Sequence, residues 1–237
     1  MNDKSKQTVV DTKEANVTGE HSNDKVILLG AYPYEDSNYL DNVELVLNRE
    51  NSEPISIKFP YSGYNIQLFT ADFTGDKKSE IMVRGGYGGS GGFEIGVIYT
   101  YENGTLVDIF NHENFNNSNP CTSKFKDNYK VSVNCGKSKY LIDISKRPKD
   151  YLDSIYTPNK TVNTSINPYV DAPIGIYPIK EIYNSYYELL IEQRIVGTVN
   201  FDTIGVIQTV IDILNSKLNI LSKGVFLSSY DERKKYK

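Results

Sequence analysis

Apolar residues along this chain occur in short runs that alternate with tight polar turns, which is the pattern of a β protein. Gly96–Phe110 and Gly205–Leu221 each predict a strand, a polar turn and a second strand, and Val43–Phe59 has the same layout. The apolar residues between Ile207 and Leu218 also lie at helical spacing, so an amphipathic helix is the alternative for that segment. The turn signal at Asn215-Ser216 favours strands.

A loop with acidic, amide or hydroxyl residues at alternating positions recurs ahead of these segments. It occurs at Asn16–Asp24 and Asp72–Glu80, which start 56 residues apart, and in degenerate form at Lys180–Glu188, 108 residues after Asp72. A further unit is expected near residue 126, where strand character persists without the loop. Units of about 54 residues with three or four strands are typical of β-propeller blades. We therefore predict an all-β, propeller-like repeat fold with about four or five small blades, and a β-sandwich is the alternative.

The predicted domain covers residues 16–228, between a disordered N-terminal segment of residues 1–15 and a flexible tail of residues 229–237. The 39% hydrophobic and 24% charged residues are ordinary for a globular protein, and 19 Tyr and nine Phe favour strands. A net charge of −4 gives no electrostatic reason to expect nucleic acid or an anionic membrane as partner. No run of 18 apolar residues occurs, so we expect no transmembrane segment.

The two cysteines, Cys121 and Cys135, flank two short predicted strands with a turn near Asp127-Asn128. A hairpin centred on that turn places the cysteines opposite one another, and we predict a disulfide between them. A metal pair or a redox thiol is the alternative, but neither a CxxC motif nor a nearby histidine supports it. A structural disulfide indicates an oxidising compartment.

The loop Asp72–Glu80 is a candidate calcium site. Side-chain oxygens at positions 1, 3, 5 and 9 of a curled loop are the ligands that a hard cation such as Ca²⁺ requires. The alternative is an acidic turn whose side chains face water. The loop Asn16–Asp24 has fewer carboxylates, and Lys180–Glu188 has lost its ligands and is expected to be a structural turn.

These loops resemble the FG-GAP/VCBS repeats of integrin-alpha-type β-propellers, in which an Asp-x-Asp/Asn-x-Asp-Gly-x-x-Asp loop binds calcium between two strands of a blade. The resemblance implies that the ligands are the side chains of Asp72, Thr74, Asp76 and Glu80 and the backbone carbonyl of Lys78. Thr74 replaces Asp or Asn, Lys77 replaces the turn Gly and Glu80 replaces Asp, so we expect weak binding.

Over residues 16–225 the order of features also resembles uncharacterised VCBS-repeat proteins of spore-forming Firmicutes. The features are Tyr32–Ser37, Gly63–Asn65, Asp72–Asp76, Gly88–Gly92, Ile176–Pro178 and Gln193–Gly197. This resemblance implies an extracellular protein of the cell envelope or spore surface. Because Met1–Ala15 lacks the apolar core of a secretion signal, either the export signal or anchor is absent from this chain, or the protein is cytoplasmic.

A glycine-rich segment, Arg84–Phe93, contains a formal GxGxxG from Gly86 to Gly91. A strand pattern follows it where a dinucleotide site requires a helix, so phosphate binding is not expected. The glycines instead allow close backbone approach, or form a loop over one face of the fold. We expect this loop to line any ligand face through Arg84, Tyr87, Gly88 and Ser90.

No catalytic set is apparent from the sequence, because His21 and His112 lie in polar loop contexts without a metal or nucleophile motif. Six tyrosines could form a stacking platform for sugars or peptide, or pack between blades; they are Tyr32, Tyr34, Tyr39, Tyr61, Tyr64 and Tyr87. We therefore predict a monomeric, non-catalytic envelope or spore-surface protein that binds a glycan, peptide or protein. The alternatives are an enzyme that acts on cell-wall or other carbohydrate polymer through a central pocket, and a purely architectural protein.

Overall fold

The first half of the molecule is a single folded sheet. The computed structural model describes residues 7–20 and 23–227. Its first eight strands are β1 (Thr8–Ala15), β2 (Asp24–Ala31), β3 (Tyr39–Asn48), β4 (Ile55–Lys58), β5 (Gly63–Ala71), β6 (Glu80–Gly88), β7 (Phe93–Glu102) and β8 (Thr105–Asn111). They pair in the order β1-β2-β3-β5-β6-β7-β8, all antiparallel, and β4 pairs with β3.

Strand β3 is the point at which this sheet folds over. Its first residues, Tyr39 and Leu40, pair with β5, whereas Glu44–Leu47 pair with β4. The two halves of the sheet therefore pack face to face around one core, to which Leu28 and Leu45 contribute from one half and Val83 and Val97 from the other. These side chains are almost fully buried.

The second half consists of two further sheets. Helix α1 (His112–Ser118) precedes β9 (Cys121–Lys126), β10 (Lys130–Cys135) and β11 (Ser138–Asp143), which form a three-stranded sheet. After α2 (Lys149–Asp153) follow β12 (Tyr169–Ile179), β13 (Glu188–Val196), β14 (Thr203–Asp212), the 3₁₀ turn η1 (Leu214–Ser216) and β15 (Asn219–Phe226). The last four strands form a sheet in sequence order.

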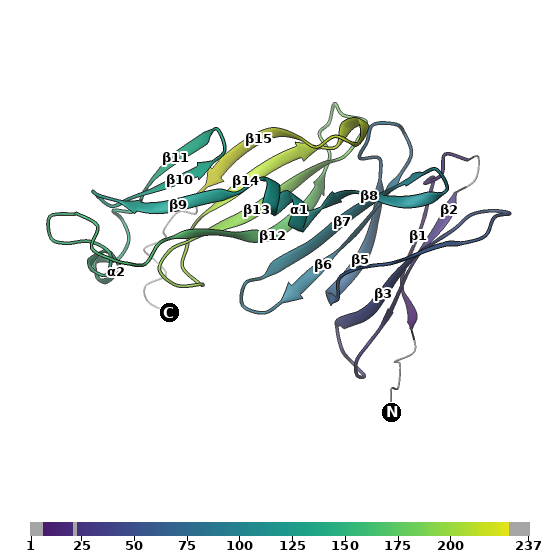
Figure 1. Cartoon of the computed structure of the whole chain (residues 1–237), viewed down its shortest axis with the longest axis horizontal. Helices are drawn as coiled ribbons and strands as arrows, with labels where there is room; N and C mark the ends of the chain where they lie inside the picture. Colours follow the sequence, from purple (N-terminus) through teal and green to yellow (C-terminus); the bar gives the residue numbers. More distant parts are fainter. Residues whose placement is uncertain (1–6, 21–22, 228–237) are drawn as a thin grey trace.

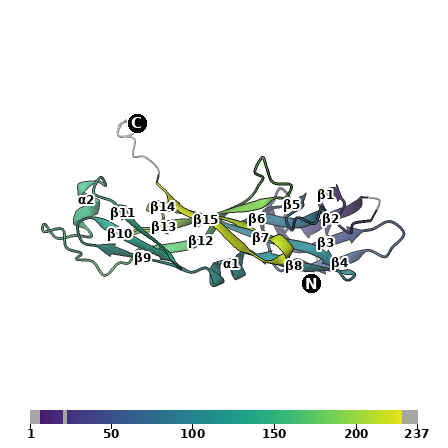
Figure 2. The same ribbon diagram turned by 90° about the horizontal axis from the view of Figure 1, so that it is seen from above.

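The β12–β15 sheet connects the two ends of the molecule. At one end Ile195 and Ile207 pack against the β9–β11 sheet, and at the other Leu189 and Ile211 pack against β6 and β7. Figure 1 shows β1–β8 at one end of an elongated molecule and β9–β11 at the other, with α1 near the middle. The view from above in Figure 2 shows the same order.

Strands β6 and β7 are buried on both faces, which explains their continuous apolar runs. Val83 and Val97 face the core of the folded sheet, whereas Met82 and Ile98 face the β12–β15 sheet. A strand that is covered on one side only would alternate apolar and polar residues. These two strands form the rigid support of the candidate site described below.

The all-β prediction is confirmed, and the β-sandwich alternative fits the structure. The propeller is not seen: the described residues form three open antiparallel sheets and no closed ring of blades. The physical reason is the pairing of β3 with β5, which joins the first two predicted units into one continuous sheet. Separate blades would have left that edge unpaired.

The predicted repeat units do correspond to antiparallel runs of strands. The loops Asn16–Asp24, Asp72–Glu80 and Lys180–Glu188 lead from β1 to β2, from β5 to β6 and from β12 to β13. The strand interpretation of residues 205–221 is confirmed by β14, η1 and β15, and the helical alternative is wrong. Asn215 and Ser216 make the turn with positive φ angles of 53° and 55°.

The prediction that residues 1–15 are disordered is wrong for Thr8–Ala15, which forms β1 and pairs with β2. This strand lies at the edge of the sheet, and only one of its eight residues is buried, so its sequence is polar and gives little strand signal. Residues 1–6 and 228–237 lie outside the described residues, and with them the predicted tail. Within the described part of the chain, no helix is long and apolar enough to cross a membrane.

Candidate functional site

A cavity of about 520 Å³ lies beside α1, where the two halves of the molecule meet. Strand β8 pairs with β7 only from Val97 onward, so the first residues of β7 have no β8 neighbour. Helix α1 and strand β12 lie beside this free stretch. The cavity is lined by Tyr87, Phe93, His112, Glu113, Asn116, Asn117, Ala172 and Pro173.

Local sequence places His112 and Glu113 at the cavity. Asn111 ends β8 and caps α1, because its side-chain oxygen accepts hydrogen bonds from the backbone N–H of Glu113 and Asn114 at 2.9 and 3.4 Å. His112 and Phe115 face inward and are buried, at 3% exposure each. The Phe115 ring packs beside Phe110, which anchors the helix to the sheet.

Four polar side chains form a connected hydrogen-bond network around Glu113. Tyr87 Oη lies 2.9 Å from His112 Nε2 and donates to Glu113 Oε1 at 3.1 Å, while Tyr61 Oη donates to Glu113 Oε2 at 3.1 Å. A tyrosine hydroxyl has only one proton, so a Tyr87 that donates to Glu113 accepts its other bond from a protonated His112 Nε2. Each oxygen of the carboxylate thus has a phenol partner.

Burial favours the neutral forms of the histidine and of the two tyrosines. It lowers the pKa of His112 from its ordinary value, and it raises the pKa of Tyr87 and of Tyr61. The Tyr61 ring packs edge-on against the His112 and Tyr87 rings, with centroid distances of 4.8 and 6.0 Å. The cavity therefore combines aromatic walls with several hydrogen-bonding groups, and its imidazole and phenols form a path for proton transfer.

The structure separates the four residues that were expected to form a ligand face. Tyr87 lines the cavity beside α1, whereas Arg84 and Gly88 line a second cavity of about 330 Å³ that shares Phe93 with the first. Ser90 instead accepts a hydrogen bond from Asn200 Nδ2 at 3.1 Å. Whether any of the four binds a ligand stays a prediction.

Sequence reasoning gave no site role to His112 or Glu113, and it named Tyr61 only as one of six tyrosines of a possible stacking platform. His112 was taken as part of a polar loop. However, Asn111 followed by the acidic Glu113 and then by Phe115 is the signal of a helix that starts directly after a strand. That signal could have placed the histidine on a short buried helix. Tyr61 comes from the β4–β5 connection, 52 residues before Glu113, and no local pattern links the two.

In the loop Asp72–Glu80 the carboxylates accept hydrogen bonds from the loop's own backbone. Glu80 is 1% exposed, and its Oε2 accepts from Phe73 N and Thr74 N at 2.7 and 3.1 Å. The two oxygens of Asp72 accept from Gly75 N and Lys77 N at 2.6 and 2.9 Å. Both arrangements stabilise the turn without a cation.

The remaining acid of this loop, Asp76, accepts from Lys78 N at 2.9 Å and pairs with the Lys78 ammonium at 2.8 Å. In the described residues, no group of three or more His, Cys, Asp or Glu side chains is placed to hold a metal. The calcium site at Asp72, Thr74, Asp76, Lys78 and Glu80 stays a prediction. Calcium would have to compete there with the hydrogen bonds of the turn.

The predicted resemblance of the first two loops extends to their hydrogen bonds. Asp24 Oδ2 accepts from Val17 N and Thr18 N at 2.9 and 2.8 Å, as Glu80 does from Phe73 and Thr74. Asn16 Oδ1 accepts from Gly19 N at 2.9 Å, in the place of Asp72. Asp24 and Glu80 are therefore buried turn acceptors at equivalent positions, and Asn16 and Asp72 are half-buried ones, which accounts for the repeat by local folding alone.

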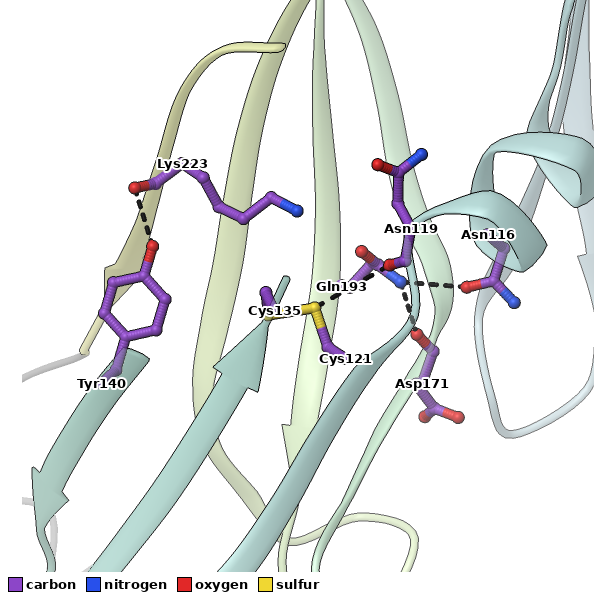
Figure 3. The surroundings of a disulfide bond; sticks show 8 residues. All are labelled: Asn116, Asn119, Cys121, Cys135, Tyr140, Asp171, Gln193 and Lys223. Atoms are coloured by element: carbon purple, nitrogen blue, oxygen red, sulfur yellow. Dashed lines mark hydrogen bonds between the residues drawn. A yellow bond between two sulfur atoms is a disulfide. The ribbon is translucent and has the colours of Figure 1, made fainter. Parts of the chain in front are cut away.

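The disulfide between Cys121 and Cys135 is present as predicted. The two residues are directly opposite in the β9–β10 pair, with Cα atoms 4.3 Å apart. Figure 3 shows the disulfide at the start of β9, together with Asn119 of the chain that leaves α1 and with Gln193. Gln193 Nε2 donates to Asn116 Oδ1 and to the Asp171 carbonyl, both at 3.0 Å, and so connects α1 with β12 and β13. The disulfide thus fixes the start of β9 directly after the helix that lines the cavity.

Two matches, one to a family model and one to a protein of Bacillus subtilis, relate this chain to known proteins. The family model of the YybI C-terminal domain matches residues 119–226, which contain β9–β15. The uncharacterised protein YybI of Bacillus subtilis (strain 168) is 31% identical over 211 residues, which is 87% of this chain and 80% of that protein. The predicted membership of the FG-GAP/VCBS proteins is therefore wrong: the resemblance rested on turn residues that folding itself requires.

Among solved structures, the rhamnogalacturonan lyase PL11 of Bacillus licheniformis is similar over 92% of this chain, at 11% identity and a TM-score of 0.39. The chain spans about a third of that protein, since the match covers 34% of its length. A similarity this low carries no argument about the function of the present chain.

Proposed function

This chain belongs to the YybI family, and we propose that it is an exported envelope or spore-surface protein that binds a glycan in the cavity beside α1. The observation that carries the proposal is the Glu113 carboxylate, which two tyrosine hydroxyls hold in place next to aromatic walls. A sugar ring has apolar C–H faces and hydroxyls at its rim. Aromatic rings bind the faces, and oriented acceptors bind the hydroxyls.

The size and composition of the cavity support this ligand. About 520 Å³ lies within the range of about 300–1,000 Å³ that is usual for small-molecule sites. Phe93 and Tyr87 provide aromatic surface, and the amides of Asn116 and Asn117 add both donors and acceptors. The disulfide, which forms and persists in oxidising compartments, supports export.

A titration with cell-wall oligosaccharides tests the proposal. We expect Glu113→Gln to weaken binding by about tenfold or more, because a hydrogen bond to a charged group contributes about 1.5–3 kcal/mol. Tyr87→Phe keeps the aromatic wall and removes only the hydroxyl, so it should weaken binding less. Tyr34→Phe is the matched control, since Tyr34 is 66% exposed and does not line the cavity. Equal affinity of wild type and Glu113→Gln, or no binding at millimolar ligand, would show that this cavity is not a glycan site.

An enzyme that acts on carbohydrate polymer is the second candidate. The observation that favours it is the hydrogen-bonded series His112–Tyr87–Glu113, because a neutral imidazole and a phenol in contact can pass a proton to or from a bound sugar. The test of this second candidate is to incubate the protein with cell-wall polymer and to measure the new chain ends that cleavage would release. The enzyme hypothesis requires that wild type produces chain ends and that Tyr87→Phe and His112→Gln do not; binding without chain cleavage would leave the non-catalytic proposal.

A further inference from the structure

The second cavity, on the other side of Phe93, contains a positively charged group in a fixed position. It has a volume of about 330 Å³, and polar side chains and glycines form most of its wall. Its lining residues include Asn65, Gln67, Arg84, Gly86, Glu94 and Ile174. None of these side chains lines the cavity beside α1.

Arg84 is held by two contacts and still has free donors. Its Nη2 forms an ion pair with Glu94, and its guanidinium stacks over the Tyr177 ring at 5.4 Å. Glu94 Oε2 also accepts a hydrogen bond from Ile176 N at 2.9 Å, so both carboxylate oxygens have partners within the protein. Among the described residues, the buried polar atoms without a hydrogen-bond partner do not include an Arg84 nitrogen, so the N–H groups of Arg84 that have no protein partner are accessible to solvent; Arg84 lines the cavity. A guanidinium with one edge fixed presents its remaining N–H groups to a carboxylate in a rigid arrangement.

Glycines open one wall of this cavity to close approach. A Cβ at Gly86 would meet no atom nearer than 3.9 Å, and at Gly92 it would meet none within 4 Å. A ligand can therefore lie against the backbone at these positions. The side-chain amides of Asn65 and Gln67 add neutral hydrogen-bonding groups nearby.

The two cavities are neighbours that differ in charge: the first contains the Glu113 carboxylate, and the second contains the Arg84–Glu94 ion pair. Phe93 lines both, and consecutive residues line one cavity and then the other at Tyr87 and Gly88 and at Pro173 and Ile174. Consecutive Cα atoms are about 3.8 Å apart. The first cavity has the carboxylate of Glu113, which disfavours an anion, whereas the second has the free N–H groups of Arg84, which attract one.

We propose that the two cavities together bind a linear acidic glycan, with a neutral sugar beside Glu113 and the carboxylate of the adjoining sugar on Arg84. This inference rests on the proposed function and names its ligand class. A single neutral sugar would leave the Arg84 donors without a partner. A glycan with carboxylates on adjoining sugars would place one of them against Glu113.

The test compares one ligand in two forms by isothermal titration. Oligosaccharides of alternating uronic and neutral sugars are measured before and after chemical reduction of their carboxyl groups, which keeps the sugar skeleton and removes the charge. We expect wild type to bind the acidic form at least tenfold more tightly, and we expect this preference to decrease with added salt. The double variant Arg84→Gln/Glu94→Gln should lose the preference.

The double variant is chosen because Arg84→Gln alone would leave Glu94 buried without its partner. Removing both charges keeps the net charge of the protein unchanged, and a thermal melt establishes that the variant is folded. Arg49→Gln is the control, because Arg49 contacts Tyr101 and Glu53 outside both cavities. Equal wild-type affinity for the two forms, or a preference that persists in the double variant, overturns the inference and leaves glycan binding intact. If wild type binds neither form, the proposed function fails with it.

Discussion

Replacing Glu80 by alanine should strongly destabilise the protein, because this carboxylate is the acceptor at the centre of the β5–β6 turn. It is 1% exposed and accepts hydrogen bonds from two backbone N–H groups, those of Phe73 and Thr74. It also accepts from the hydroxyls of Thr74 and Thr100, at 3.1 and 3.4 Å. In the alanine variant the hydroxyls can rotate toward other partners, but the two N–H groups cannot.

The magnitude follows from these two orphaned donors. A buried group left without a partner costs about 1–3 kcal/mol, so we expect Glu80→Ala to lower the free energy of unfolding by about 4 kcal/mol. That is a large share of the roughly 5–15 kcal/mol by which folded domains are stable. Glu80→Gln keeps one oxygen that can accept both N–H groups, so its loss should be about 1–2 kcal/mol.

Equilibrium unfolding in urea, followed by far-ultraviolet circular dichroism with EGTA present, measures these differences. Asp76→Ala is the control from the same loop: Asp76 is exposed and pairs only with Lys78, and such a pair contributes about 0–1 kcal/mol. The reasoning is refuted if Glu80→Ala loses less than about 1 kcal/mol, the cost of a single orphaned group, or if it loses no more than Glu80→Gln.

Three further predictions concern the disulfide, the calcium loop and the buried histidine. Replacing Cys121 and Cys135 by serine should lower the free energy of unfolding by about 3 kcal/mol, as expected for a closed segment of about 15 residues; an unfolding midpoint that dithiothreitol leaves unchanged would contradict this. Millimolar calcium should raise the melting temperature of wild type but not of Asp76→Ala, with a dissociation constant of about 10⁻⁴ to 10⁻³ M, and an unmoved wild-type midpoint would show that the loop is only a turn. Burial lowers the pKa of His112 below its ordinary 6.5, so its contribution to stability is complete above that pH and is lost as the pH falls toward its lower folded pKa. His112→Gln should therefore flatten the loss of stability as the pH falls below about 6.5, and an unchanged slope of stability against pH in urea unfolding series would argue against a buried neutral imidazole.

The candidate site was only partly visible in the sequence. The glycine-rich segment was predicted to line a ligand face, because glycines in a strand context indicate close backbone approach; Tyr87 lines one cavity and Arg84 and Gly88 another, and ligand binding there stays a prediction. The roles of His112 and Tyr61 in the network around Glu113 were not predicted, because they depend on partners about 25–50 residues away: the His112 ring contacts the Tyr87 hydroxyl, and the Tyr61 hydroxyl reaches Glu113. One sequence offers no signal for such contacts.

Local sequence by itself determined most of the strands, their turns and the disulfide of this protein, but not the edge strand β1, whose sequence is polar. These features depend on neighbours along the chain. Alternation of apolar and polar residues specifies a strand, Asn215 and Ser216 adopt the positive φ angles of the turn, and a hairpin brings Cys121 opposite Cys135. Tertiary structure alone decided how the units assemble. The pairing of Tyr39 with Tyr64 joins two units into one folded sheet, and the same strands with that edge left free could have formed separate blades. Because the cavities lie where β6, β7 and α1 meet β12, the site exists only through that long-range packing.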